Sequence, residues 1–193
     1  MSLHAIVIDA SEGRLPVWAV VGEYRRAHMT RVAELLGSWA GSLGLDDDEQ
    51  IRWRAAGYLH DVLREESPET LSQRVPLELR GLPGPLLHGP AAAERLRVGG
   101  MKDGELLSAI AFHTVGDATF GPLGRALYVA DFIEPGRFFM QEWTAALRAR
   151  MPHELNAVVF EIVRARLVHL VQEGSTLEAR SIGFWNTLVG EHR

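Results

Sequence analysis

Apolar residues recur with a period near 3.6 along most of the 193-residue chain, and strict alternation of apolar and polar residues is almost absent. Gly and Pro residues fall between the periodic segments rather than inside them. This pattern predicts an all-α fold, and the length is typical of a single domain with one core. We therefore expect a helical bundle over residues 15–193. Residues 1–14 are too short and mixed to assign, and we treat them as an N-terminal extension for which flexibility is one interpretation.

Helix-capping and helix-breaking residues set the predicted boundaries in the first half of the chain. A long helix should begin at Val17 or Gly22 and run to Leu43, because Gly44 is a typical helix terminator. The acidic run that starts at Asp46 opens a second helix, which ends near His60. Apolar residues share one face of the first helix, namely Val32, Leu35, Leu36 and Trp39.

The same signals continue through the second half. Ser67 and Pro68 open a short helix, and the Pro-rich segment 82–85 forms a rigid connection that leads to a helix start at His88. Asp103 caps a helix that ends at His113, and Pro122 begins one that Pro135 stops. The last helices are predicted over residues 142–151, 153–173 and 178–190.

Charge and composition restrict the class of partner. The net charge is −5 and the Lys and Arg residues are scattered, which argues against an extended nucleic-acid interface but allows a small phosphorylated ligand held by a few cations. The chain has no cysteine, no apolar run of membrane-spanning length and no leader-like start. We expect a cytoplasmic protein that does not enter a membrane. Apolar positions on the last helices leave a homodimer open.

The most informative chemistry is the adjacent pair His60–Asp61 at a predicted helix end. Two neighbouring helical side chains project about 100° apart and can bind one ion together. Further residues of the metal-ligand type stand on other segments, namely His28, His88, His113 and Asp131. Together these six residues predict a metallohydrolase, although His28 or His113 taken alone is more often a core or surface histidine.

Asp131 strengthens this interpretation because nearly all its neighbours are apolar. A buried unpaired carboxylate is unfavourable, so Asp131 needs a cation. Spacing alone leaves three candidates: a metal ion, Arg137 or a histidine from another helix. The remaining histidines lie near the termini or among charged positions, and we interpret them as structural or solvated: His4, His153, His169 and His192.

These residues stand in segments that resemble the HD-domain superfamily and, within it, the YqeK family. The likeness covers roughly residues 22–188 and implies an HD-type helical bundle. It also implies a hydrolase that cuts diadenosine tetraphosphate symmetrically into two ADP. The segments that carry it are Arg25-x-x-His28, Leu59-His60-Asp61, Leu87-His88-Gly89, Ala109-Ile110-Ala111-Phe112-His113-Thr114 and Leu127-Tyr128-Val129-Ala130-Asp131-Phe132-Ile133-Glu134-Pro135-x-Arg137.

The resemblance assigns roles to individual residues. It implies iron-type metal ligands at His28, His60, Asp61 and Asp131, with His88 and His113 near a second metal or the substrate phosphates. Iron rests on the resemblance, whereas the mixed imidazole and carboxylate donors suit manganese, cobalt or zinc equally well. The hypothesis is in-line attack of a metal-activated water on phosphorus.

Other predicted contacts follow from this hypothesis. Catalytic roles are expected for Asp61, His88, His113 and Arg64. Substrate contacts are expected from Arg25, Arg64, His88, His113, Thr114 and Arg137. Base stacking is one interpretation of the aromatic residues Phe138, Phe139 and Trp185, but core packing is the favoured one. No binding role is expected for Trp18, Trp39, Trp53 and Trp143.

Three departures from the family pattern concern how a nucleotide is recognised. Arg64 replaces the usual lysine, residues 138–140 replace a Phe-Pro-Gly turn, and residues 179–181 replace a Pro-x-Thr segment. Two alternatives therefore stay open. One is an HD-type phosphohydrolase of another nucleotide, such as a mononucleotide, a triphosphate or a cyclic dinucleotide. The other is a nucleotide-sensing module without turnover.

Overall fold

The computed structural model describes residues 3–192, and every regular element in this range is helical, which confirms the predicted all-α class. Met1 and Ser2, at the start of the expected extension, and Arg193 lie outside the described residues. In chain order the elements are α1 (Ala5–Ser11), α2 (Glu23–Ser42), α3 (Asp47–Leu59), α4 (Pro68–Arg74), the 3-10 turns η1 (Leu77–Leu79) and η2 (Gly84–Leu86), α5 (His88–Val98), α6 (Gly104–Phe112), α7 (Pro122–Ile133), α8 (Gln141–Arg150), α9 (Leu155–Gln172) and α10 (Ala179–Glu191).

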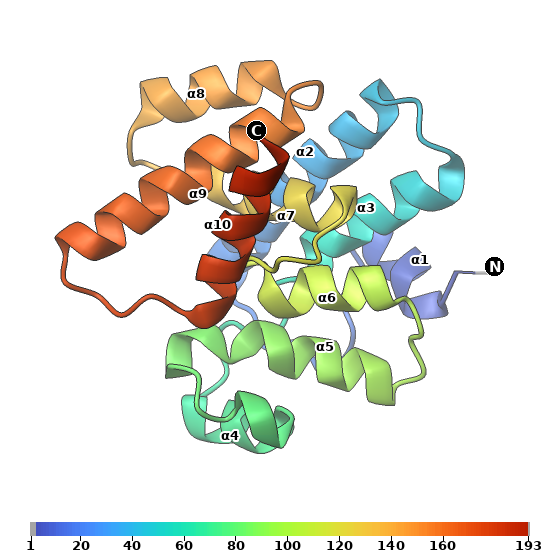
Figure 1. Cartoon of the computed structure of the whole chain (residues 1–193). Helices are drawn as coiled ribbons and strands as arrows, with labels where there is room; N and C mark the ends of the chain where they lie inside the picture. Colours follow the sequence, from blue (N-terminus) through green and yellow to red (C-terminus); the bar gives the residue numbers. More distant parts are fainter. Residues whose placement is uncertain (1–2, 193) are drawn as a thin grey trace.

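Helix α7 is the central element of the bundle. Its Leu127, Val129 and Ala130 side chains are fully buried, because α2, α3, α6, α8 and α9 all pack against it. Helices α5 and α6 lie side by side below α7 in Figure 1, with α4 beneath α5, whereas α8 and α9 form the upper part. The predicted apolar face of α2 is buried at Val32 and Leu36, as expected for a core-facing stripe.

Caps explain why the helices begin and end where the sequence predicted. The Asp46 carboxylate accepts a hydrogen bond from the Glu49 amide (2.9 Å), and Asp103 accepts one from the Leu106 amide (3.0 Å). Gly44 takes a φ of +66°, in the left-handed region, immediately after α2. The boundaries of the last three helices lie within two residues of the predicted ranges.

The first 14 residues are not a separate extension in the part that the structure describes. His4 caps α1, since its Nδ1 accepts a hydrogen bond from the Ile6 amide (3.2 Å). Val7 and Ala10 are buried, and α1 packs against α3. This segment therefore belongs to the folded domain. Helix α1 has only seven residues, which gave too weak a periodic signal for a helix to be assigned.

Two glycines allow the helices to approach at backbone distance. A Cβ atom on Gly57 would lie 2.5 Å from Ala33 Cα, so α3 packs directly on the backbone of α2. A Cβ on Gly89 would lie 2.6 Å from the carbonyl oxygen of Ala111, so α5 packs on the end of α6 in the same way. Each close approach occurs within three residues of a histidine, His60 in one case and His88 in the other.

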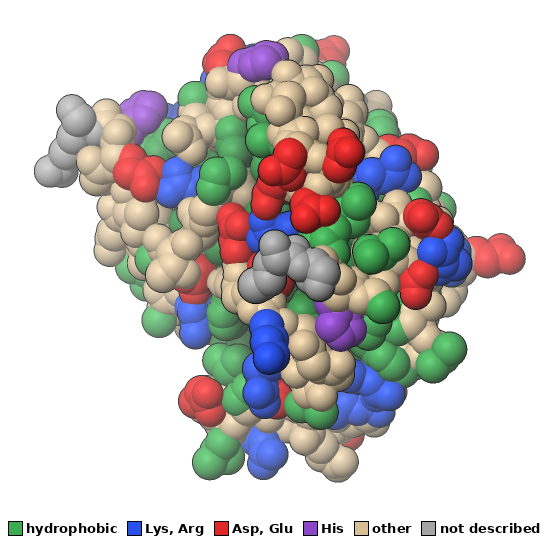
Figure 2. Space-filling view, turned by 90° about the vertical axis from the view of Figure 1, so that its right-hand side faces the viewer, with side chains coloured by type: hydrophobic (Ala, Val, Ile, Leu, Met, Phe, Trp, Pro, Cys, Tyr) green, Lys and Arg blue, Asp and Glu red, His purple; other side chains and the backbone are tan. Residues whose placement is uncertain are grey.

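The surface carries both signs of charge. Figure 2 shows acidic and basic side chains interspersed over the face that carries the amino-terminal end of the chain. Between residues 3 and 192, none of the helices combines the length and the apolar character needed to span a bilayer.

The pair Arg52–Asp103 predicts a pH-dependent part of the stability. Burial opposes ionisation of Asp103, but hydrogen bonds from Arg52 (2.6 and 2.9 Å) and from the Leu106 amide hold its pKa below 3.8. The stabilisation is present above pH 3.8 and is lost as the pH falls through the lowered pKa. Asp103→Asn keeps a capping side chain but loses the ion pair, so we expect a loss of about 1 kcal/mol in urea unfolding at pH 7.

The difference between wild type and Asp103→Asn should shrink as the pH falls below 3.8. Asp47→Asn is the matched control, because Asp47 is an exposed first-turn carboxylate of α3. An equal loss in this control, or a difference that does not change with pH, would contradict the assignment.

The α2–α3 crossing gives a second prediction. Gly57→Ala should lower the free energy of unfolding by about 1–3 kcal/mol, because its Cβ meets backbone atoms that cannot rotate away. Gly41→Ala, on the exposed end of α2, meets only the Gln50 side chain at 4.0 Å and should be neutral or stabilising by up to about 1 kcal/mol. Thermal unfolding of the two variants measures the contrast, and similar melting temperatures would show that the crossing has room for a methyl group.

Candidate metal centre

The structure brings together all six residues predicted to be ligands, from five helices. His28 lies within α2, His60 and Asp61 follow α3 directly, His88 is the first residue of α5, His113 follows α6, and Asp131 lies in the last turn of α7. Their imidazole and carboxylate groups form two overlapping groups of donor atoms with suitable spacing for a metal ion.

The first group surrounds the Nε2 atom of His28. This atom lies 3.3 Å from His60 Nε2 and 3.1 Å from Asp131 Oδ1. Asp61 completes the group, since its Oδ2 lies 3.7 Å from His28 Nε2 and 3.4 Å from His60 Nε2. Two imidazole nitrogens and two carboxylate oxygens therefore converge on one small volume.

The second group uses the other oxygen of Asp61. Asp61 Oδ1 lies 3.0 Å from His88 Nε2 and 3.5 Å from His113 Nε2, and the two Nε2 atoms are 3.1 Å apart. Asp61 thus presents one carboxylate oxygen to each pair of histidines. This is the arrangement expected of a carboxylate that bridges two cation positions.

The opposite ring nitrogens determine where the protons are. The Nδ1 atoms of His60, His88 and His113 lie 2.8–2.9 Å from the backbone carbonyl oxygens of Gly57, Pro85 and Ile110, respectively. A carbonyl oxygen only accepts, so each Nδ1 must carry a proton, and Nε2 is the ring nitrogen that faces the site.

The Nδ1 proton of His28 is also donated away from the site, in this case to a carboxylate. Its Nδ1 lies 3.1 Å from Glu134 Oε1, and both residues are buried. Four Nε2 atoms and the oxygens of Asp61 and Asp131 consequently face one another at close range. Imidazole with carboxylate donors suits a divalent transition metal.

The pKa shifts at the site have identifiable causes. Burial opposes ionisation of Asp61 and Asp131, but His60 and hydrogen bonds from histidines hold both pKa values below their ordinary range. Burial also opposes the charge on His28, yet hydrogen bonds to Asp131 and Glu134 raise its pKa. For His88, burial dominates and lowers the pKa.

Arginines partly neutralise the two aspartates. Arg25 donates from Nη1 to Asp61 Oδ2 (2.7 Å), and Arg137 donates from Nη2 to Asp131 Oδ1 (2.6 Å). Two of the three cations considered for Asp131, namely Arg137 and a histidine, are therefore in place. Arg25 Nε is buried and has no hydrogen-bond partner within residues 3–192. The Arg64 side chain makes no ion pair in the same range.

A cavity of about 650 Å³ opens beside the donor atoms. The ligands Asp61, His88, His113 and Asp131 line it at one end. Every residue predicted to contact substrate also borders this cavity, namely Arg25, Arg64, His88, His113, Thr114 and Arg137. The histidine and arginine motifs, separated along the chain, therefore serve one ligand-sized space.

The cavity also has residues that sequence interpretation missed. Trp143, Arg166 and His169 line it, although Trp143 was given no binding role and His169 was interpreted as structural or solvated. His169 is exposed, in agreement with its interpretation, and the expectation for Trp143 stays a prediction. Their place beside the cavity was not foreseen because α8 and α9 lie outside the motif segments, and only the packing of these helices brings the side chains to the site. The spacing of Arg166 and His169, on one face of α9, was the available signal.

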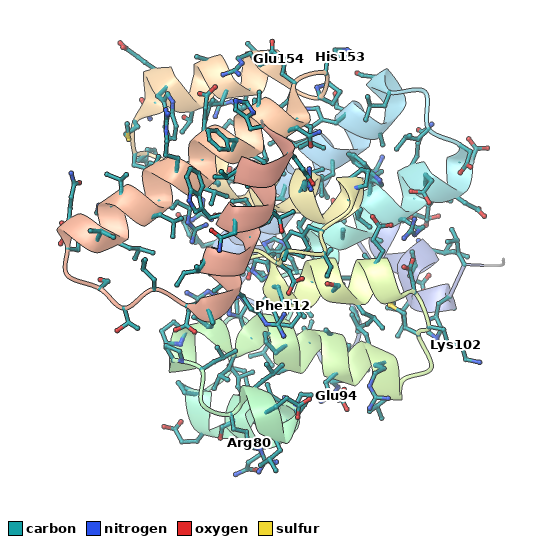
Figure 3. The ribbon with its side chains drawn as sticks, in the orientation of Figure 1. Arg80, Glu94, Lys102, Phe112, His153 and Glu154 are labelled. Carbon is teal, nitrogen blue, oxygen red and sulfur yellow. The ribbon has the colours of Figure 1, made fainter. Side chains whose placement is uncertain are left out.

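The three aromatic residues for which core packing was favoured have different positions. Phe138 is 83% exposed, so core packing is wrong for it, and Phe139 borders the cavity. Trp185 packs as expected, stacked on Phe160 with ring centroids 5.0 Å apart. The exposed His153, labelled in Figure 3 between α8 and α9, agrees with the interpretation given to it.

Residues 179–181, which differ from the family pattern, contact the loop after α6 and do not line the cavity. The Arg180 guanidinium lies 3.8 Å from the ring centroid of Phe112, which Figure 3 marks near the start of α10. Arg180 also pairs with Asp117, and Ser181 Oγ donates to the Val115 carbonyl (2.8 Å). These contacts hold the loop that follows His113.

Glu134 is a further residue that the list of predicted site residues omitted. It accepts hydrogen bonds from Arg31 Nη2 (3.2 Å) and from the Gly136 amide (2.6 Å), besides its contact with His28. Burial alone would raise the pKa of Glu134, but His28, Arg31 and the Gly136 amide lower it to about 2. Glu134 therefore stays ionised and fixes the orientation of the His28 ring.

Comparison with known proteins gives consistent matches. The family profile described as HD domain matches residues 25–159. The symmetrical bis(5'-nucleosyl)-tetraphosphatase of Staphylococcus aureus is 28% identical over 170 residues, covering 85% of this chain and 86% of that protein. The protein of the same name from Bacillus subtilis is 26% identical over 173 residues, covering 86% and 90%.

A solved structure has a similar fold. It is described as a predicted HD superfamily hydrolase involved in NAD metabolism from Clostridium acetobutylicum. It matches with a TM-score of 0.77 and 26% sequence identity, and the match covers 96% of each chain. The likeness thus extends over nearly the full length of both chains.

The contact between Glu134 and His28 predicts an effect on metal affinity. Glu134→Gln keeps the size of the side chain but removes the charge that fixes the His28 ring, so the affinity for manganese or zinc should fall about 10–100-fold. Competition with a chromophoric chelator measures this change. Glu191→Gln, which alters a surface ion pair with Arg125, is the control. Equal affinities for both variants would exclude the orienting role.

Proposed function

The chain belongs to the HD domain family, and from this premise we propose that it is a metal-dependent phosphohydrolase that cuts diadenosine tetraphosphate symmetrically into two ADP. Membership of the family implies divalent-metal binding. The observation that carries this proposal is the cluster of histidine and aspartate donor atoms, in two overlapping groups, beside a cavity that arginines also line. The names of the curated relatives supply the substrate.

The residues fit a metal through their donor atoms. His28, His60, Asp61 and Asp131 would hold one ion, and His88 and His113 would share Asp61 to hold a second. Iron is our preferred metal, and manganese, cobalt and zinc accept the same donors. A bound divalent metal supplies Lewis-acid polarisation of a phosphoryl oxygen and lowers the pKa of water to about 7.

The chain's own cations position the polyphosphate. Arg25, Arg64 and Arg137 border the cavity, and guanidinium groups bind phosphate oxygens with two parallel hydrogen bonds. The Arg64 guanidinium is available to an anionic ligand, because its side chain makes no ion pair with a carboxylate within residues 3–192. Thr114, next to His113, adds a hydroxyl donor. These groups hold the reacting phosphorus near the donor atoms and stabilise charge that develops on its oxygens.

The description of the solved structure suggests a second nucleotide to test as a substrate. That protein is described as involved in NAD metabolism, and NAD, like diadenosine tetraphosphate, joins two nucleosides through phosphates. NAD should therefore be assayed in parallel. A cytoplasmic location and a homodimer remain predictions of the sequence.

The decisive experiment is product analysis. Protein loaded with ferrous iron or manganese is incubated with diadenosine tetraphosphate, and the nucleotides are separated by chromatography. We expect ADP as the product, and no ADP from His60→Ala, which removes a ligand. Arg137→Ala should lower kcat/KM about 10–100-fold, because charge-assisted hydrogen bonds to phosphate are lost. Arg97→Ala, in an exposed ion pair with Glu94, should leave kcat/KM unchanged.

Other outcomes of the product analysis would contradict the proposed symmetrical cleavage. AMP with ATP would mean that a different phosphorus is attacked. Tight binding of metal and nucleotide without any product would identify a sensing module instead of an enzyme. Full turnover by Arg137→Ala would show that Arg137 does not clamp the substrate.

A further inference from the structure

One wall of the cavity takes no part in holding the metal ligands. It is formed by Phe139 and Trp143, around the start of α8, and by Arg166 and His169, on α9. These residues lie beyond Asp131 and Arg137 in the sequence and supply mostly aromatic and cationic surface. Because this wall lies beside the candidate metal centre, a ligand bound there would extend along it.

The aromatic rings of the wall are held in defined orientations. Phe132 is the shared neighbour, with ring centroids 5.0 Å from Phe139 and 6.0 Å from Trp143 and interplanar angles of 69° and 84°. Edge-to-face contacts of this kind fix the rings. Phe139 is nevertheless 41% exposed, so part of its surface is accessible to a ligand.

The turn that delivers these rings has an uncommon backbone. Met140 has a φ of +41°, in the left-handed region that non-glycine residues rarely adopt, and it begins α8. Met140 itself lines the cavity, with Phe139 before it and Trp143 one turn after it. Strained backbone of this type is retained where surrounding structure and function require it.

Arg166 brings an available positive charge to the same wall. Its guanidinium carbon lies 5.2 Å from the ring centroid of Tyr128 and 5.7 Å from that of Phe132. Within residues 3–192 it forms no ion pair with a carboxylate. A guanidinium held by ring faces instead of an acid keeps its charge for an anionic ligand.

We propose that this wall is a nucleoside subsite, where a base stacks on Trp143 and Phe139 while Arg166 contacts the phosphate nearest the sugar. Stacked aromatic side chains accept any base through its π face, and the adjacent cation adds selectivity for a nucleotide over a free base. The choice of a nucleotide as ligand rests on the proposed function. The subsite deepens that function by naming the residues that recognise the nucleoside.

Binding calorimetry separates recognition of the base from recognition of phosphate. Metal-loaded protein is titrated with ADP and, separately, with pyrophosphate, which lacks the nucleoside. Wild type should bind ADP more tightly than pyrophosphate. Trp143→Ala should weaken ADP binding about tenfold and leave pyrophosphate binding unchanged. Trp185→Ala, which removes a stacked tryptophan outside the cavity, is the matched control for both ligands.

Two further variants make the test robust. Phe139→Ala removes a more exposed ring and should also weaken ADP selectively, so the test does not depend on correct folding of Trp143→Ala. Arg166→Gln should weaken ADP binding about tenfold, whereas Arg164→Gln, an exposed neighbour on α9 outside the cavity, should not.

The proposal is overturned if ADP affinity is unchanged in Trp143→Ala and Phe139→Ala, or if ADP and pyrophosphate lose affinity equally. It is also overturned if wild type does not prefer ADP. Failure of the proposed function gives a different result: wild type would release no ADP from diadenosine tetraphosphate, while the selective effect of Trp143 on ADP binding would persist and support the subsite.

Discussion

Four imidazole rings direct their Nε2 atoms toward one another because their Nδ1 protons are donated to groups outside the site. Three of these protons are donated to backbone carbonyls, and that of His28 to the Glu134 carboxylate. These nitrogens converge with the oxygens of Asp61 and Asp131, and mixed imidazole and carboxylate donors of this kind suit a divalent transition metal. The fold must therefore hold six donor groups in mutual contact, and much of the helical packing serves this requirement.

The helices bring these donor groups together through direct backbone contact at two glycines. Gly57 lets α3 rest on the backbone of α2, and the same glycine supplies the carbonyl that orients His60. Gly89 lets α5 approach the end of α6, which places His88 beside His113. A larger residue at either position would separate helices whose ligands must lie about 3 Å apart.

Much of this site could be predicted from the sequence, because most of its ligands stand at or near helix ends that caps and breakers identify. Asp103, for example, locates the start of α6 and hence its far end at His113. Trp143, Arg166 and His169 could not be found in this way. Their helices carry ordinary amphipathic patterns, and only tertiary packing decides that these faces border the cavity. Glu134 was missed because its role depends on a contact with a residue 106 positions away.

The two donor groups draw on separate helical hairpins, α2–α3 and α5–α6. His60 and Asp61, which follow α3, are shared between them. A small displacement of the α5–α6 hairpin would change the second group and leave the distances within the first intact. The geometry of the second donor group thus depends on the placement of one hairpin. Protein engineering could alter that group without rebuilding the helices that carry His28 and His60.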